Sequence, residues 1–496
     1  MQKNQNVSLG EKVVTSSLWM GSWRWTARLI GFFSTIILAR LLFPEDFGIV
    51  ATASIIVGFF SIMSDLGTDS YLIRHQAPDD NDYNTAWTLR IIVITFASLA
   101  IFLIAPGGAD YFGDQRLTPV LQIMAIAGWF GAFANIGLTK FRRDLQFRKI
   151  AFIGISQRLS GTFATIILAY WLRNYWAMVI GEIVFMLVGL VLSYSQHSYR
   201  PGFTLIHIKK QWAFCKWILV QNLATFLQSQ GDSFVIAKFF GIQTMGVYSM
   251  GMRFAALPTK QVLTPVLPPI YSGLAKKQHD DGDFRSSVLK VIGAVMVLML
   301  PAATLFEGLD HALITALLGD RWIPVIPLVA PLTISIMLVV ITSPVVTALT
   351  IKGRVKLLAG LNWFSAISVV TALVVAASWQ EIEILVWARV AITFLLVIIY
   401  YHFLRAILNI SPISLLTSIY RPLLASGVLM LVIHQLSVVI VSPWLLIISA
   451  IFLGGGAYLL SALLLWKIAG SPDSGEALLV NKLIKVISRL MKKYDS

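Results

Sequence analysis

The chain is a succession of long apolar segments separated by short polar loops, and this pattern limits its fold more than any other feature. A helix needs about 20 predominantly apolar residues to cross roughly 30 Å of hydrocarbon. We therefore predict an all-α polytopic membrane protein with fourteen spans, at residues 16–41, 46–68, 84–105, 117–139, 150–172, 174–195, 212–239, 245–268, 286–306, 323–350, 355–378, 382–406, 419–441 and 443–467.

The composition supports this class of protein and excludes others. Hydrophobic residues make up 57% of the chain and charged residues only 13%, whereas a soluble domain carries roughly 25% charged residues. The formal net charge is +15. Because most of the excess lies in short loops, it indicates orientation in a bilayer, and we do not expect nucleic acid as a partner. The single cysteine, Cys215, excludes a disulfide framework within one chain.

Positive charge is distributed unequally between the two sides of the predicted spans. The termini and the loops on their side hold 27 Lys and Arg residues, and the opposite loops hold 5. Cytoplasmic loops carry the excess of Lys and Arg, so we expect both termini in the cytoplasm.

The sequence also contains a weak internal repeat. The segment ARLLFPEDFGIV starts at Ala39 and AKFFGIQTMGVY starts at Ala237, and an offset of 198 residues aligns Gly48 with Gly246. Six predicted spans separate the copies, so both have the same orientation in the membrane. Parallel repeats are typical of transporters, and they predict two six-helix lobes with a cavity between them. The expected organisation is an N-terminal lobe at 1–208, a C-terminal lobe at 209–410, two additional spans at 411–467 and a basic amphipathic cytoplasmic tail at 468–496.

Three segments in order resemble a known family. They are LARLLFPEDFGIVATASIIVGFFSIMSDLGTDSYLI, LQFRKIAF and LLGDRWIPVIPL. They are similar to the polysaccharide-transporter family, the Wzx-like flippases of the multidrug/oligosaccharidyl-lipid/polysaccharide flippase superfamily. The resemblance implies a V-shaped pair of six-helix bundles in the bacterial cytoplasmic (inner) membrane. It implies transport rather than catalysis: export of undecaprenyl-diphosphate-linked oligosaccharides for exopolysaccharide or lipopolysaccharide synthesis, with membrane lipids, a polymerase and chain-length machinery as further partners.

Two arginines interrupt the first predicted span. Arg24 and Arg28 are four residues apart, so both lie on one helix face. Turning such a side chain toward lipid costs several kcal/mol. A guanidinium fork matches two phosphate oxygens, which makes both residues candidates for diphosphate binding. For Arg24, an interfacial position at the membrane surface is the alternative.

The eighth predicted span carries two further cations, Arg253 and Lys260. Lipid II flippases are similar in placing cavity arginines on their first and eighth spans, so the resemblance implies a diphosphate-binding role for Arg253, with Lys260 beside it. Ion pairs with carboxylates on neighbouring helices are the alternative for both.

Three carboxylates are candidates for coupling or gating by H⁺ or Na⁺: Asp232, Glu182 and Asp65. An intramembrane carboxylate is a functional candidate because an unpaired charge is costly there. A salt bridge that holds one conformation is the alternative for Asp232, and a helix-end role is the alternative for Asp65.

Other functions remain alternatives at this point. A multidrug or cation antiporter would need mid-span carboxylates, whereas cations outnumber them here. A membrane-embedded glycosyl- or phospho-transferase would need convergent carboxylates or a metal site. The sequence contains neither a G-x-x-x-x-G-K-[ST] nor an H-E-x-x-H pattern. We expect no metal, cofactor or catalytic residue.

Overall fold

The computed structural model describes residues 9–64, 67–258, 273–478 and 480, and helices are the only regular secondary structure in this part of the chain. Contacts divide the chain into two compact units, Met1–Val247 and Tyr248–Ser496. Ten of the described helices are long and apolar enough to cross a membrane. The protein is therefore an all-α, multi-pass membrane protein, as predicted, while the number of fourteen spans stays a prediction.

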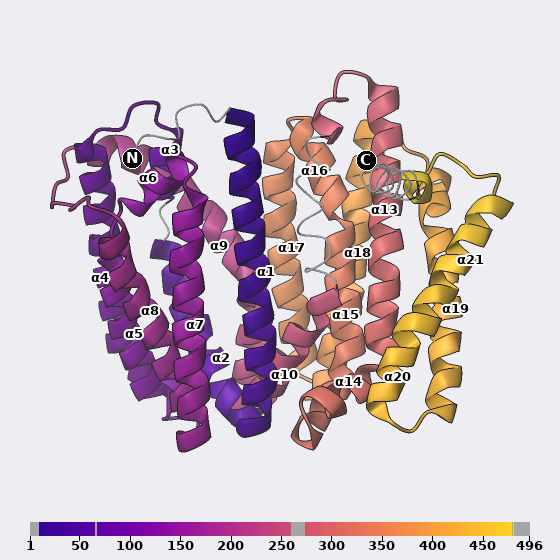
Figure 1. The fold of residues 1–496 in the computed structure, drawn as a ribbon, viewed down its shortest axis with the longest axis horizontal. Coiled ribbons are helices and arrows are strands. Elements are labelled where there is room, and N and C mark those ends of the chain that lie inside the picture. The colour runs from indigo at the N-terminus through magenta and orange to yellow at the C-terminus, as the bar shows by residue number, and fades with distance from the viewer. Residues whose placement is uncertain (1–8, 65–66, 259–272, 479, 481–496) are drawn as a thin grey trace, which may run out of the picture. The chain divides into compact units, whose positions relative to one another are not determined.

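The first unit contains nine complete helices among its described residues. Figure 1 shows α5, α7 and α8 beside one another, and the contacts agree, since α8 packs on both α5 and α7. The helices are α1 (Leu9–Leu41), α2 (Pro44–Ser64), α3 (Thr68–Arg74), α4 (Asp80–Phe112), α5 (Leu117–Ala132), α6 (Leu138–Arg143), α7 (Phe147–Leu172), α8 (Trp176–Gln196) and α9 (Ile208–Phe239). The next helix, α10 (Gly241–Ala255), begins in this unit and ends in the second.

The second unit packs around α13, which contacts α15 and α19, while α18 contacts α15 and α17 (Figure 1). Its described elements are α13 (Asp281–Gly308), α14 (Asp310–Leu317), the 3₁₀ helix η1 (Asp320–Val325), α15 (Ile326–Ile341), α16 (Ser343–Ile351), α17 (Val355–Ala377), α18 (Ile382–Leu408), α19 (Pro412–Val439), α20 (Pro443–Ser449), the π-helical η2 (Ala450–Gly454) and α21 (Gly455–Ile468). The predicted domain boundaries, including the one between residues 208 and 209, stay predictions.

Four predicted spans do not belong to the ten apolar helices. α1 has 33 residues and α9 has 32, so each is long enough, but both contain many polar side chains. α5 has only 16 residues, and α10 has 15. These exceptions matter for function because α1 carries the arginines on which the functional prediction depends.

The two copies of the sequence repeat meet in space within the first unit. A Cβ added at Gly48 would lie 2.8 Å from the carbonyl carbon of Ile242 and closer still to its oxygen. A Cβ added at Gly246 would lie 2.7 Å from the carbonyl carbon of Pro44, again closer to the oxygen. The offset of 198 residues relates Pro44 to Ile242 as it relates Gly48 to Gly246. The starts of α2 and α10 therefore cross through a reciprocal contact that only glycine permits.

After α21, the chain packs back against α13 of the same unit. Helical structure resumes at Gly475, which packs against the backbone of Gly293 and Ala294 on α13. Glu476 is buried and lies 3.4 Å from the Arg421 Nε atom of α19. The helical turn that begins at Gly475 is thus packed into the protein, and all five basic residues of the predicted tail lie outside the described part of the chain.

Candidate functional site

The arginines of α1 lie where the sequence predicts them. Arg24 is exposed and Arg28 is half-buried, and their spacing places both on one face of the helix. The Arg28 Cζ atom lies 5.7 Å from the centre of the Trp25 ring, within the range of a cation–π contact. Within the part of the chain that the structure describes, neither guanidinium has a hydrogen bond or an ion pair. Both are therefore available to an anionic ligand.

The helix α7 packs along α1 and fixes its position. A Cβ added at Gly154 of α7 would lie 2.6 Å from the indole ring of Trp23, so this glycine makes room for the tryptophan. The two helices approach closely here because a large side chain of one faces the missing side chain of the other.

A third arginine, Arg158 of α7, lies against the same helix. Its Nη2 atom lies 2.7 Å from the position that a Cβ of Gly31 would occupy on α1. Arg158 is half-buried, and the charge of Glu182 on α8 acts on it electrostatically. Arg158 thus lies against α1, the helix that carries Arg24 and Arg28, and near Glu182 of α8. The sequence shows Arg158 as a cation inside a span but does not indicate that Gly31 leaves room for it.

The other predicted site residues that the structure describes lie on other helices, α9 and α10. Asp232 is buried on α9, and its Oδ1 accepts a hydrogen bond of 2.8 Å from the Ser233 amide. Arg253 is exposed on α10 and belongs to the second unit. Asp65 and Lys260 lie outside the described residues.

Two further mid-span arginines differ because backbone or hydroxyl oxygens bind them. Arg90 of α4 donates from Nε to the carbonyl oxygen of Ala132 at 3.1 Å and from Nη2 to that of Ala134, just after the C-terminus of α5. Arg389 of α18 donates to Ser335 Oγ at 3.0 Å and to Tyr248 Oη at 2.6 Å. A cation favours a helix C-terminus, and bound oxygens reduce the cost of burial. These two arginines therefore hold helices together.

A cavity of about 430 Å³ lies within the first unit, among α2, α3, α4, α5 and α8. Its polar lining includes Ser61, Asp69 and Arg90, and the remainder is mostly apolar. None of the described predicted site residues lines it. Asp69 accepts a hydrogen bond of 2.6 Å from Thr139 and pairs with Arg142 at 2.5 Å, so its carboxylate already has partners.

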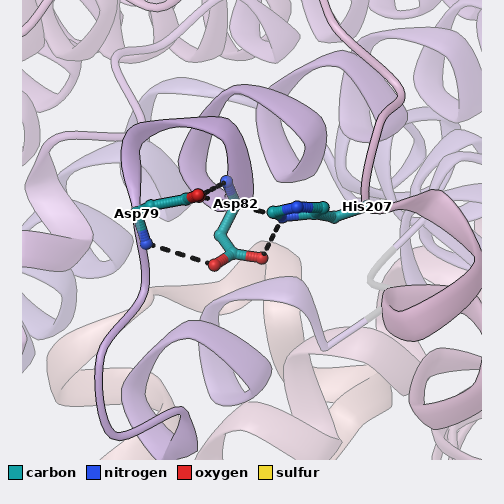
Figure 2. A group of neighbouring side chains, drawn as sticks. All are labelled: Asp79, Asp82 and His207. Atoms are coloured by element: carbon teal, nitrogen blue, oxygen red, sulfur yellow. Dashed lines mark hydrogen bonds and ion pairs between the residues drawn. The ribbon is translucent and has the colours of Figure 1, made fainter.

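Among the described residues, the group with metal-ligating side chains is Asp79, Asp82 and His207, whose potential ligand atoms all lie within 4.8 Å of one another. Figure 2 shows that these atoms are already engaged. Asp79 Oδ1 accepts from the Asp82 amide at 2.8 Å, Asp82 Oδ2 accepts from the Asp79 amide at 3.2 Å, and Asp82 Oδ1 lies 2.8 Å from His207 Nδ1. The hydrogen bond donated by the Asp82 backbone amide and the charge of the nearby His207 hold the pKa of the Asp79 carboxyl below its ordinary value.

This cluster attaches the segment before α9 to the start of α4. The Asp79 and Asp82 side chains form a capping box, which satisfies backbone amides at the N-terminus of α4. Gln211 donates to the Asp82 carbonyl oxygen at 2.9 Å, and the Thr204 amide donates to Thr88 Oγ1 at 3.0 Å. The geometry is that of a structural clamp along α4.

Comparison with known proteins is consistent with a polysaccharide-related membrane protein. A family model described as polysaccharide biosynthesis protein matches residues 37–327. The chain is 22% identical over 424 residues to the lipopolysaccharide biosynthesis protein WzxC of Escherichia coli K12, which covers 85% of each chain. It is 24% identical over 306 residues to the succinoglycan biosynthesis transport protein ExoT of Rhizobium meliloti, covering 61% of this chain and 62% of the relative.

Solved structures share the fold. The lipid II flippase MurJ, in an inward closed conformation, superposes with a TM-score of 0.74 at 13% identity, over 92% of this chain and 99% of MurJ. An inward-facing multidrug resistance transporter of the MATE family, in the MOP superfamily, gives a TM-score of 0.59 at 14% identity, over 77% of this chain and 94% of that one. The family model covers more than half of the sequence, and the chain therefore belongs to the polysaccharide biosynthesis protein family.

Proposed function

We propose that the protein is a flippase that moves undecaprenyl-diphosphate-linked oligosaccharides across the bacterial cytoplasmic membrane, with both termini in the cytoplasm. The observation that carries the proposal is the unpaired guanidinium pair on α1, in a member of a polysaccharide biosynthesis family. A flippase for such a lipid needs a polar surface for the head group while the prenyl chain stays in hydrocarbon. It needs no catalytic group, so the protein acts as a transporter and not as an enzyme.

The chemistry of α1 fits the diphosphate better than a cationic drug. Arg24 and Arg28 place two positive charges on one face of a helix with no carboxylate bonded to either in the described residues. A guanidinium donates two parallel hydrogen bonds to phosphate oxygens and stays charged at any physiological pH. A cation would be repelled by the same surface.

The names of two relatives support this proposed function. WzxC is named for lipopolysaccharide biosynthesis and ExoT for succinoglycan transport. The identity of the sugar differs between them, so we propose the lipid diphosphate as the shared recognition element. We further propose that an ion gradient supplies the energy for transport and that a carboxylate such as Asp232 or Glu182 couples the ion to it. The substrate should be tested before this coupling.

The first test is polysaccharide export by a producing strain that carries Arg28→Ala or Arg28→Lys at matched membrane levels. The alanine variant is expected to abolish export and the lysine variant to restore little of it, because an ammonium lacks the fork. Arg405→Ala, which removes an exposed cation from the end of α18, is the matched control and should export normally.

A second test uses the purified protein in liposomes that contain undecaprenyl-diphosphate-linked oligosaccharide from the same strain. Flipping that depends on Arg28 supports the proposal. Uptake of a cationic dye without flipping would instead support the antiporter alternative, and export by both Arg28 variants at the normal level would overturn the role of this residue.

A further inference from the structure

The polar face of α1 continues beyond Arg28, and a neighbouring helix supplies its next charge. Residues 24, 28 and 31 are spaced i, i+4 and i+7, which places them on one stripe of a helix. Position 31 is glycine, so α1 itself contributes no side chain there.

The Arg158 guanidinium occupies the place that a side chain at residue 31 would take. Its Nη2 atom lies 2.7 Å from the position of a Cβ on Gly31, so its charged end lies on the same stripe as Arg24 and Arg28. Figure 1 shows α1 and α7 side by side, and the contacts between them agree. Three guanidiniums therefore follow one another along about 10 Å of α1, given the rise of 1.5 Å per residue.

The charges on this stripe are not balanced by the residues around them. In the described part of the chain, none of the three guanidiniums has a hydrogen bond or an ion pair, and Glu182 acts on Arg158 electrostatically. Three cations and one nearby carboxylate leave an excess of positive charge along this face of α1. In Arg90 and Arg389, by contrast, hydrogen bonds to carbonyl and hydroxyl oxygens reduce the free-energy cost of removing the guanidinium from water. The stripe has no such partners.

We propose that Arg158 is a third diphosphate-binding residue and that Arg24, Arg28 and Arg158 form a guanidinium ladder along α1. This inference rests on the proposed function. A diphosphate carries two phosphates and engages two neighbouring guanidiniums at once. Three guanidiniums offer two overlapping positions, one on Arg24 and Arg28 and the next on Arg28 and Arg158. The head group can therefore advance by about one helical turn while Arg28 keeps its contact.

Gly31 belongs to the same proposed binding site because it leaves the space in which the Arg158 guanidinium lies. A Cβ at this position would displace the end of a flexible side chain and no backbone atom. Gly31→Ala therefore moves the charge of Arg158 without removing it and without disturbing the packing of the helices. This variant keeps the test decisive if Arg158→Gln fails to fold.

The test measures binding of undecaprenyl diphosphate to the purified protein in detergent, with undecaprenol as the uncharged probe. Arg158→Gln is expected to weaken diphosphate binding about tenfold, the usual loss for a hydrogen bond to a charged group. Binding of undecaprenol should not change. Arg173→Gln, which removes an exposed cation at the other end of α7, and Gly21→Ala, where an added Cβ meets no atom within 4 Å, are the matched controls.

A double-mutant comparison separates a ladder from a packing effect. Gly31→Ala should weaken diphosphate binding in the natural sequence and have no additional effect in the Arg158→Gln background, because both changes remove the same guanidinium from the stripe. Equal effects of Gly31→Ala in both backgrounds would contradict the inference.

Lipid flipping in liposomes distinguishes a failure of the guanidinium ladder from a failure of the proposed flippase function. Normal diphosphate binding and flipping by both variants, with loss of flipping by Arg28→Ala, would overturn the ladder and leave the proposed function intact. Failure of the natural protein to bind undecaprenyl diphosphate or to flip the lipid-linked oligosaccharide would overturn the proposed function, and the ladder with it. Slower flipping by Arg158→Gln than by Arg173→Gln supports both.

Discussion

The reciprocal contact between Gly48 and Gly246 should make each of these glycines essential for stability. In Gly246→Ala, the new methyl group would lie 2.7 Å from the carbonyl carbon of Pro44, and a normal contact begins at 3.4 Å. The obstacle is backbone on the opposite helix, which cannot rotate away as a side chain can. The starts of α2 and α10 must therefore separate by at least about 0.7 Å, and more to clear the oxygen.

Separating the two helices costs free energy, and replacing glycine by alanine, a better helix former, recovers part of it. Overpacking a well-packed contact costs about 1–3 kcal/mol, and a backbone obstacle belongs at the upper end. Alanine recovers about 1 kcal/mol relative to glycine in a helix interior. We expect a net loss of about 2 kcal/mol in the free energy of unfolding. For a unit of roughly this size, that corresponds to a fall in Tm of about 4–8 °C.

The assay is thermal unfolding of the purified protein in detergent, followed by tryptophan fluorescence at matched concentrations. Gly107→Ala is the control, because a Cβ there meets no atom within 4 Å and the variant should be as stable as the natural protein or more so. The variant with both Gly48→Ala and Gly246→Ala should lose less than the two single losses together, because one movement relieves both contacts. An unchanged Tm for Gly246→Ala would refute the reasoning.

Three further predictions concern other parts of the fold. His197 is half-buried beside Lys140 and other cations. Its partial burial and these charges lower its pKa below 6.5, so the unfolded state binds more protons. Tm should therefore fall as the pH drops below about 6.5, and less in His197→Gln. Arg389→Lys should lower Tm because one ammonium cannot reproduce the bonds that the guanidinium makes to two hydroxyls, whereas Arg405→Lys should not. Glu476→Gln should destabilise the protein by about 3 kcal/mol because it leaves the charge of the buried Arg421 without a carboxylate partner, and adding Arg421→Met should recover most of the Tm.

Much of the fold could be predicted because hydrophobic length and spacing are local properties of the sequence. The ten apolar helices correspond to segments that the length rule identifies. The repeat aligned Gly48 with Gly246 but did not predict that the two segments contact each other. The short lengths of α5 and α10 could not be predicted, because the position of a helix end inside an apolar run depends on tertiary packing. Fourteen spans therefore stay a prediction, although helices occur in each predicted segment.

The candidate site was predictable only where its geometry lies within one helix. The shared face of Arg24 and Arg28 follows from a spacing of four residues, and the structure places both on α1. The approach of Arg158 depends on the packing of α7 against a glycine 127 positions earlier in the chain. Sequence spacing contains no information on that contact. The same limit applies to Arg90 and Arg389, because their oxygen partners Ala132 and Ser335 lie 42 and 54 positions away in the chain.

The partial exposure of the α1 arginines is what a transport site requires. A carrier exploits only the difference in affinity between its states, so a head group held too tightly in one state would not leave. Arg24 is exposed, and Arg28 and Arg158 are half-buried, which lets water compete with a bound diphosphate at each of them. Arg389 is also half-buried, but it already has oxygen partners and would exchange them only at a large cost. Under the proposed function the same residue type serves two purposes in this protein, and the number of oxygens already bound to each guanidinium decides which purpose it serves.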